Sequence, residues 1–302
     1  MPDFSRLQQQ IQFLAEIGLI VVGSLLGVSG PLAASAFAAT PVDLYHDMES
    51  GANGDLLTPA LMNAASHGRA TWSIGHGEMW VSTNKGRDLP GPVIVDRTSY
   101  TGNAATRNWM FNDNNSLNCV VCSLPGSYPK ITVACFYTPG VTIRFANQFD
   151  TVCMTGNQGF SVLQTRNDDG KGPYFRAHSC TAGWRTTFSP KQIKIVPGKT
   201  YWVNLHFDAD QGKTSVAAFD PDKAFAQVGD VVVADSWLHS IGIRQIRFGR
   251  ADNHGPNPTA KTQSYFGQIL IDYSHGAFPL VPTADRQVRP VEAGAGAIRR
   301  ER

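Results

Sequence analysis

The chain has 302 residues and a formal net charge of +2, from 26 basic and 24 acidic side chains. This balance, with the basic residues spread along the chain, excludes a nucleic-acid-binding surface as the main function. Short runs rich in Val, Ile, Thr, Phe and Trp are divided by Gly and Pro, and helical heptads are absent. The composition therefore predicts an all-β protein.

Residues 1–39 predict a secretory signal peptide. The stretch from Phe13 to Val28 is largely apolar, and small residues such as Ala36 and Ala38 follow it. The apolar core is short for a membrane span and precedes a small-residue cleavage site, although an uncleaved amphipathic anchor is the alternative. No later segment has the apolar length of a membrane helix. We therefore expect a secreted, periplasmic or cell-surface protein without stable membrane insertion.

The rest of the chain divides into one domain and a tail. Residues 40–282 have the length of a single large β-sandwich. Residues 283–302 contain a low-complexity Gly/Ala stretch and a charged end, which predict a disordered C-terminal tail.

Within the domain, an opening strand is expected over residues 43–48. A short helix is expected over 56–67, with Thr58 as its cap and Pro59 at its first position. The passage 84–118 is rich in Gly, Pro and Asn, and we expect a long loop with a functional role. Further strands are expected over residues 71–74, 79–82, 130–137, 141–145, 151–154, 159–166 and 174–179.

Five cysteines follow the signal segment: Cys119, Cys122, Cys135, Cys153 and Cys180. In an exported chain, structural disulfides are expected, and the odd count leaves at least one thiol unpaired or available for an intermolecular bridge. Cys119 and Cys122 have the spacing of a redox or half-zinc motif, but no second pair follows. Structural disulfides or buried thiols are the better interpretation.

Two segments near the end of the domain are motif-like. Gly198-Lys199-Thr200-Tyr201-Trp202 lies in an alternating run over residues 193–208, which a polar Gly turn joins to a second strand over 214–220. Together with Phe266-Gly267-Gln268-Ile269-Leu270-Ile271-Asp272, this series resembles the closing strands of concanavalin A-like (laminin-G-like) jelly rolls. The resemblance implies a sandwich of two antiparallel sheets with long loops and at most one or two short helices. This fold carries lectins, hydrolases, lyases and adhesion modules, so the resemblance implies no single activity.

Alternation sorts the side chains of the 201–208 strand by face. Tyr201 begins the apolar core face, and the opposite face carries Trp202, Asn204 and His206. Aromatic rings stack on the apolar faces of sugars, and short polar groups fix their hydroxyls. The leading hypothesis is an exported carbohydrate-binding protein that recognises a polysaccharide on its concave sheet, with this row at the centre.

Aromatic side chains from loops are expected to line the sides of this ligand site. The candidates are Trp80, Trp109 and Tyr137. A structural or adhesion module of the cell surface, without a small ligand, is a further alternative, favoured if the 84–118 passage fills the concave face.

Enzymatic activity on the same fold is the other alternative. A retaining glycoside hydrolase is disfavoured, because paired carboxylates are required and the Glu-x-Asp-x-x-Glu strand of the jelly-roll glucanases is absent. Polysaccharide lyases instead neutralise a uronate carboxylate with Arg or Gln and abstract a proton with His or Tyr. Residues of these types are Arg176, His178, Tyr201 and His206, but the Gln-x-His strand of the jelly-roll alginate lyases is absent.

The resemblance also implies a structural calcium between the first and last strands. Glu49, Asp55 and Asp272 stand where its ligands are expected, and carboxylate and carbonyl oxygens are the ligands that Ca²⁺ prefers. The alternative is a capped turn for Glu49 and Asp55 and a solvated strand residue for Asp272.

Overall fold

The computed structural model describes residues 41–76, 92–98, 105–112, 118–140, 148–156, 159–168, 172–181, 185–236, 242–249, 263–282 and 288–289. All of them belong to the compact unit Ala39–Arg302. The predicted signal peptide lies outside these ranges. In the described part of the chain, no helix has the length and apolar character needed to span a membrane.

Strands dominate the described chain, with one short helix, α2 (Pro59–Ala64), and one 3₁₀ turn, η1 (Pro221–Lys223). The strands are β1 (Leu44–His46), β2 (Ser66–Gly68), β3 (Thr71–His76), β4 (Val93–Thr98), β5 (Ala105–Asn112), β6 (Asn118–Tyr128), β7 (Lys130–Thr138), β8 (Gln148–Gly156), β9 (Gly159–Asp168), β10 (Gly172–Thr181), β11 (Thr186–Phe188), β12 (Ile193–Lys194), β13 (Tyr201–Asp208), β14 (Lys213–Asp220), β15 (Ala226–Gln227), β16 (Val232–Asp235), β17 (Ile243–Gly249) and β18 (Gln263–Asp272).

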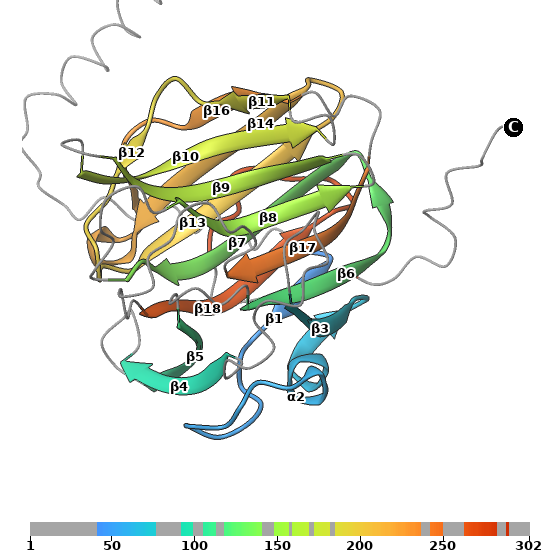
Figure 1. The fold of residues 1–302 in the computed structure, drawn as a ribbon. Helices are drawn as coiled ribbons and strands as arrows, with labels where there is room; N and C mark the ends of the chain where they lie inside the picture. The colour runs from blue at the N-terminus through green and yellow to red at the C-terminus, as the bar shows by residue number, and fades with distance from the viewer. Residues whose placement is uncertain are drawn as a thin grey trace, which may run out of the picture. The chain divides into compact units, whose positions relative to one another are not determined.

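The strands form two antiparallel sheets that face each other (Figure 1). The ten-stranded sheet has the order β15-β14-β13-β7-β18-β1-β2, with β16 beside β14, β5 beside β18 and β4 beside β5. The eight-stranded sheet has the order β11-β10-β9-β8-β17-β6-β3, with β12 beside β10. The predicted all-β sandwich of two antiparallel sheets is confirmed.

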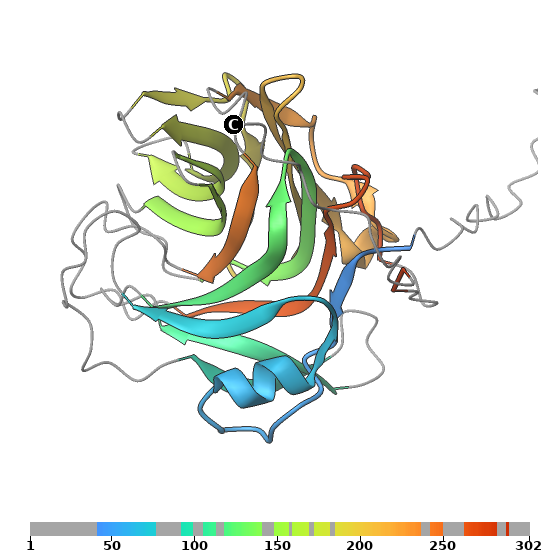
Figure 2. The same ribbon diagram turned by 90° about the vertical axis from the view of Figure 1, so that its right-hand side faces the viewer.

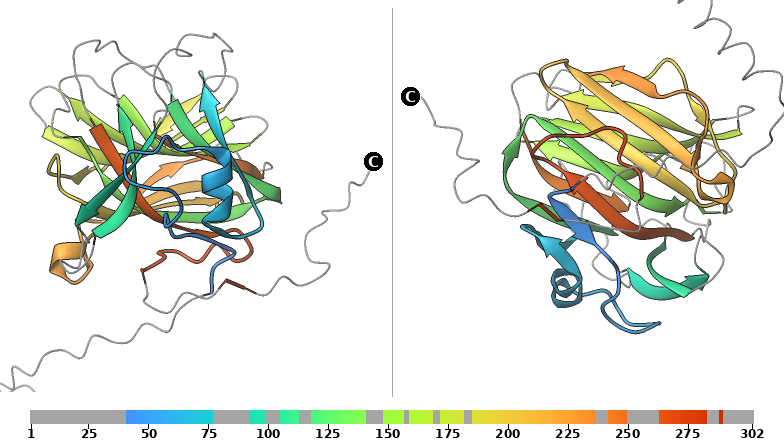
Figure 3. Two further views of the ribbon diagram at one scale, coloured as in Figure 1. Left: turned by 90° about the horizontal axis from the view of Figure 1, so that it is seen from below. Right: turned by 180° about the vertical axis from the view of Figure 1, so that it is seen from behind.

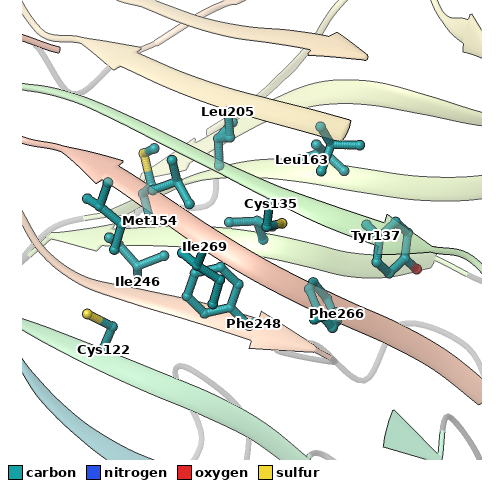
Figure 4. Close-up of a cluster of buried hydrophobic side chains, with 14 of the residues drawn as sticks. Cys122, Cys135, Tyr137, Met154, Leu163, Leu205, Ile246, Phe248, Phe266 and Ile269 are labelled. Carbon is teal, nitrogen blue, oxygen red and sulfur yellow. The ribbon is translucent and has the colours of Figure 1, made fainter. Parts of the chain in front are cut away.

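The main core lies between the inner faces of the two sheets. Every second residue of a strand points inward, so the inner face of β7 carries Val133, Cys135 and Tyr137. Met154, Leu163, Leu205, Ile246, Phe248, Phe266 and Ile269 fill the space around them (Figure 4). Each fully buried large apolar side chain contributes about 1.5–3 kcal/mol, so this layer supplies the main driving force for folding.

A second apolar cluster lies on the outer face of the ten-stranded sheet. Residues 274–282, here called the strap, cross the outside of this sheet after β18 (Figure 3, right). Leu280 of the strap joins a buried cluster with Val42, Ala134, Phe136, Trp202, Ala217, Phe219 and Leu270. The ten-stranded sheet is therefore packed on both of its faces.

The two ends of the domain meet beside the strap. Val288 forms a parallel bridge with Val42, and the backbone N–H of Arg289 donates to the carbonyl oxygen of Val42 at 2.9 Å. We expected residues 283–302 to be a disordered tail, and this is wrong for Val288 and Arg289, which are docked on the sandwich. The other residues of the predicted tail lie outside the described ranges.

The first elements of the domain agree in part with those predicted from the sequence. Thr58 caps α2, because its Oγ1 accepts from the backbone N–H of Leu61 at 3.3 Å, and Pro59 follows it. The helix ends at Ala64, earlier than expected, because residues 66–68 pair with β1 as strand β2. The 84–118 passage was expected to be a loop, but its described parts are strands β4 and β5 of the ten-stranded sheet.

Three of the expected strand segments differ from the prediction or lie outside the described residues. The alternating run over residues 193–208 is interrupted, because a turn at Gly198, with φ of 76°, separates β12 from β13. The strands expected over 79–82 and 141–145 lie outside the described residues.

All five cysteines are buried, and none forms a disulfide bond. No cysteine has another cysteine as a cross-strand neighbour; for example, Cys135 pairs with Val203 and Ile269, and Cys153 with Val162 and Arg247. The expected structural disulfides are therefore wrong, and the second interpretation, buried thiols, describes these residues. Burial raises the pKa of Cys122 and Cys135, so both stay neutral.

Candidate functional site

The predicted ligand row on β13 is covered by the strap. Trp202 has no exposed surface, and its Nε1–H donates to the carbonyl oxygen of Leu280 at 2.7 Å. The Oδ1 of Asn204, also fully buried, accepts from the backbone N–H of the same Leu280 at 2.8 Å. The expectation of an open sheet face here is wrong, because the chain's own backbone occupies the indole N–H of Trp202 and the amide oxygen of Asn204.

His206 lies in the same row and is partly exposed. Its ring stacks on Phe278 of the strap with centroids 5.0 Å apart, and its Nδ1 lies 2.8 Å from Thr132 Oγ1. Burial lowers the pKa of His206 to about 4, so the ring is neutral at pH 7. It therefore contributes to strap packing in its uncharged form.

Tyr201 lies on the opposite, inner face of β13. It is buried in the main core, and its hydroxyl accepts from the backbone N–H of Val196 at 2.8 Å. Burial raises the pKa of Tyr201. Because Tyr201 and His206 are on opposite faces of one strand, they cannot act together on a substrate.

The three predicted wall aromatics do not surround this row. Trp109 is buried in the main core, in edge contact with His46 and Trp72. Tyr137 also points into the core, where it packs against Phe266. The expectation that Trp109 and Tyr137 line a ligand site is wrong for this reason, and Trp80 lies outside the described residues.

The predicted calcium ligands are not brought together. Asp272 accepts from Arg289 at 2.8 and 3.2 Å, and from the backbone N–H groups of His275 and Ala277. Burial raises its pKa, but these donors outweigh burial and lower the pKa to about 2. The carboxylate is thus occupied by hydrogen-bond donors.

Glu49 and Asp55 are exposed, and Asp55 accepts from the backbone N–H of Ala52 at 2.8 Å, as in a capped turn. Among the residues that the structure describes, no group of three or more His, Cys, Asp or Glu could hold a metal ion. Calcium binding remains a prediction without a described ligand set.

The outer face of the eight-stranded sheet presents a different set of side chains. Figure 2 shows that β8, β9 and β10 are strongly curved, with this face on the inside of the bend. Cross-strand pairing places one row across five strands, in the order Arg247 (β17), Cys153 (β8), Val162 (β9), His178 (β10) and Phe188 (β11). The neighbouring register position pairs Gln164 with Arg176.

These side chains form a connected polar and aromatic cluster. The Nε–H of Arg176 donates to Gln164 Oε1 at 2.6 Å, and its guanidinium carbon lies 3.9 Å from the centroid of the Phe188 ring. His178 stacks on Phe188 at 4.5 Å and meets the edge of Phe160 at 5.4 Å. A planar guanidinium held at its edge and at its face has a fixed orientation.

Further cations lie around this cluster. Arg247 and Arg166 are both partly exposed, whereas Arg176 is 7% exposed and His178 is 4% exposed. The described side chains of this face include no carboxylate. Asp150 is the register partner of Gln164, but its side chain is outside the description.

The structure thus places the residues predicted for a lyase on two different sheets. Arg176 and His178 share the outer face of the eight-stranded sheet, whereas Tyr201 and His206 belong to the other sheet. Tyr174 also projects from β10 on the face of Arg176, because the two residues are two positions apart on one strand. It stands four residues from His178, about 13 Å along the strand, so these two side chains flank Arg176 without meeting.

No family model matches the chain, and no curated protein matches it. Solved structures with a similar arrangement include the cellulose-induced protein Cip1, at 9% sequence identity and a TM-score of 0.45, over 76% of this chain and 97% of that one. A β-1,3-glucanase from Mycobacterium marinum matches at 9% identity and a TM-score of 0.41, over 78% of this chain and all of the other (100%).

A SAP-like pentraxin from Limulus polyphemus matches at 12% identity and a TM-score of 0.32, over 66% of this chain and 75% of that one. At these values the likeness is one of fold and carries no argument about activity. The architecture described above, two antiparallel sheets packed face to face, is the one that the resemblance to concanavalin A-like jelly rolls implied.

Proposed function

We propose that this chain is an exported protein that binds an acidic polysaccharide on the outer face of its eight-stranded sheet. The observation that carries the proposal is the cluster of Arg176, Gln164, His178 and Phe188, on the strands β9, β10 and β11 at one edge of that sheet. Guanidinium groups match the geometry of carboxylates, and charge-assisted hydrogen bonds are about twice as strong as neutral ones. The chemistry fits the carboxylate of a uronic acid unit.

The electrostatics of the face support the same ligand class. Arg247 and Arg166 are partly exposed and extend the positive charge on both sides of Arg176. Neutral sugars gain little from three arginines on one face, whereas a polyanion gains at each of them. Salt is therefore expected to weaken the binding.

The binding test compares a polyuronate with its carboxyl-reduced, neutral form, measured by isothermal titration calorimetry. The wild-type protein is expected to bind the polyuronate and not the reduced polymer. Arg247→Gln is expected to weaken binding about tenfold, as expected for loss of a charge-assisted hydrogen bond. Arg244→Gln removes the same charge from an exposed position of the same strand and is the matched control. Equal binding of both polymers, or of neither, contradicts the proposal.

A second candidate function, polysaccharide lyase, is favoured by the position of His178 beside the Arg176–Gln164 pair. In β-elimination a base removes the proton next to the uronate carboxyl group, the C4–O bond to the leaving sugar breaks, and a C4=C5 double bond forms. The leaving oxygen takes up a proton. Arginine would stabilise the charge that develops on the carboxylate, and a neutral histidine would serve as the base.

The lyase reaction has its own measurement. Unsaturated products absorb in the ultraviolet, so a rise in absorbance during incubation with polyuronate would show cleavage. His178→Asn should then abolish the rise while polymer binding persists. Constant absorbance with bound polymer identifies a binding protein.

The adhesion alternative depended on the 84–118 passage filling the concave face. Its described strands, β4 and β5, belong to the ten-stranded sheet instead, where β5 pairs with β18 and β4 pairs with β5. This pairing gives no support for that alternative.

A further inference from the structure

We infer that the strap is an acid-sensitive cover: protonation of His206 releases the middle of the strap, residues 278–280, from the ten-stranded sheet, while the chain on either side stays docked. Release exposes the buried Trp202 and Asn204 side chains to water. The proposed function concerns the other sheet, so the two proposals stand or fall separately.

Charged contacts fix the chain on either side of this middle. Before it, the Asp272 carboxylate accepts from the backbone N–H of Ala277 at 2.9 Å. After it, the Arg289 guanidinium lies 2.8 Å from the same carboxylate, and the backbone N–H of Arg289 donates to the carbonyl oxygen of Val42 at 2.9 Å. Burial raises the pKa of Asp272, but the donors around it outweigh burial and lower the pKa to about 2. Both contacts therefore persist at pH 4.

Neutral groups hold the middle of the strap. Phe278 stacks on the uncharged His206 ring, with centroids 5.0 Å apart and an interplanar angle of 25°. Leu280 is 3% exposed, and its N–H and C=O groups bond to Asn204 and Trp202. Asn204 Nδ2 is buried without a hydrogen-bond partner among the described residues. Opening returns this donor to water, which offsets part of the burial that is lost.

The charged groups near His206 are already paired with other side chains. Asp208, two residues along β13, lies 2.9 Å from Lys130 of β7. Asp272 of β18 is paired with Arg289. The two carboxylates favour a charged His206 and Lys130 disfavours it, but burial is the largest effect.

The nearest side chains on the adjacent strands are uncharged. The register partners of His206 are Thr132 on β7 and Ser215 on β14. The strap contributes the Phe278 ring, and its one titratable side chain, His275, is exposed. Protonation of His206 under the closed strap is therefore unfavourable.

Acid shifts the strap toward the open state because the two states bind the proton differently. In the closed state, burial lowers the pKa of His206 to about 4, whereas in the open state the ring is in water and its pKa approaches 6.5. As the pH falls, the open state therefore takes up the proton first. The equilibrium constant for opening should rise about 20-fold between pH 7 and pH 5.

Hydrogen exchange followed by NMR measures this opening. The Leu280 backbone N–H and the Trp202 indole N–H are bonded across the contact between strap and sheet. After correction for intrinsic exchange rates, their protection should fall about 20-fold between pH 7 and pH 5.

Two further N–H groups distinguish local opening from global unfolding. The backbone N–H of Arg289 reports on the docked end, and that of Ile195, which donates to Pro173 at 3.0 Å, reports on the other sheet. Both should be more strongly protected than Leu280 at every pH. Low concentrations of urea should accelerate exchange at Ile195 and leave exchange at Leu280 nearly unchanged.

Three variants separate His206 from the other titrating groups. His206→Phe keeps a ring against Phe278 and cannot be protonated, so the protection of the Leu280 N–H should no longer depend on pH. His206→Gln tests the same point with a polar side chain. His275→Asn removes the exposed histidine of the strap and is the matched control, which should keep the change of about 20-fold.

Three results would overturn the inference. Equal protection and equal urea dependence at Leu280 and Ile195 would show that the strap opens only when the domain unfolds. Loss of protection at Arg289 together with Leu280 would show that the docked end is released as well. The same pH dependence in wild type and in both His206 variants would show that another group controls the opening.

Discussion

The outer faces of the two sheets both carry polar and aromatic side chains at alternating strand positions, but these side chains make different contacts on each face. On the ten-stranded sheet, Trp202 and Asn204 hold the backbone of Leu280, and the strap covers the row. On the eight-stranded sheet, Arg176, Gln164 and Phe188 form a polar cluster with an exposed aromatic edge. A polar and aromatic row is therefore compatible with either a ligand or a segment of the same chain.

The comparison predicts the largest loss of stability for Trp202→Ala. This variant removes a fully buried indole from the cluster under the strap, and it leaves the Leu280 carbonyl without its donor. We expect a loss of about 3–5 kcal/mol in the free energy of unfolding, measured by urea denaturation. Unchanged stability with lost polysaccharide binding would instead make this row the ligand site.

Arg289→Met tests the junction beside the strap. Arg289 contacts both Asp43 and Asp272, whose side chains are 6% and 0% exposed. Without it, two buried carboxylates lose their cation, and we expect a loss of about 3 kcal/mol in the free energy of unfolding. Lys191→Met breaks an exposed pair with Asp230 and is the control, with no measurable change expected. Equal stability of the two variants would show that Val288 and Arg289 do not anchor the domain.

His206 predicts how the stability of the strap depends on pH. Its pKa is about 4 in the folded state against 6.5 in the unfolded chain, so unfolding takes up a proton between these values. Stability should therefore be complete above pH 6.5 and fall as the pH drops from 6.5 to about 4. We expect His206 to account for about 1–3 kcal/mol of this fall.

The comparison of wild-type protein with His206→Gln in urea denaturation at pH 7 and pH 4 isolates this contribution. His46 shows a similar lowering of its pKa to about 4 through burial, and it remains in both proteins. The difference between the two proteins should therefore change with pH, whereas a constant difference would rule out titration of His206.

The last prediction concerns the reactivity of the cysteines and involves no change in the free energy of unfolding. Cys153 and Cys180 lie on the outer face of the eight-stranded sheet and Cys135 lies in the core, yet all are buried and none forms a disulfide bond. A thiol reagent should react with none of the five cysteines in the native protein and with all five after unfolding without reductant. Fewer than five thiols after unfolding would reveal a disulfide.

Much of the fold follows from short-range patterns. Alternation correctly separated Tyr201 from Trp202 on β13, and the same period of two residues explains why Arg176 and His178 share one face of β10. The strap was not predicted, because its bonds to Trp202 and Asn204 join residues 78 and 76 positions apart. No local signal distinguishes an exposed row from one that a distant segment covers.

The candidate site shows the same limit. The sequence identified Arg176 and His178 as candidate site residues, but it did not identify the side chains on neighbouring strands that contact them. Pairing with β9 and β11 brings in Gln164 and Phe188, and it leaves Tyr201 and His206 on the other sheet. Phe188 was missed because its strand has three residues, too few for alternation to be visible.

The most direct test of the contrast between the two faces is the affinity of a polyuronate for three proteins: wild type, Arg247→Gln and Trp202→Phe. Trp202→Phe keeps an aromatic ring under the strap and removes only the indole donor to Leu280. We predict about tenfold weaker binding for Arg247→Gln, and binding within about twofold of wild type for Trp202→Phe. Normal binding by Arg247→Gln together with lost binding by a folded Trp202→Phe would contradict the account and return the ligand to the ten-stranded sheet.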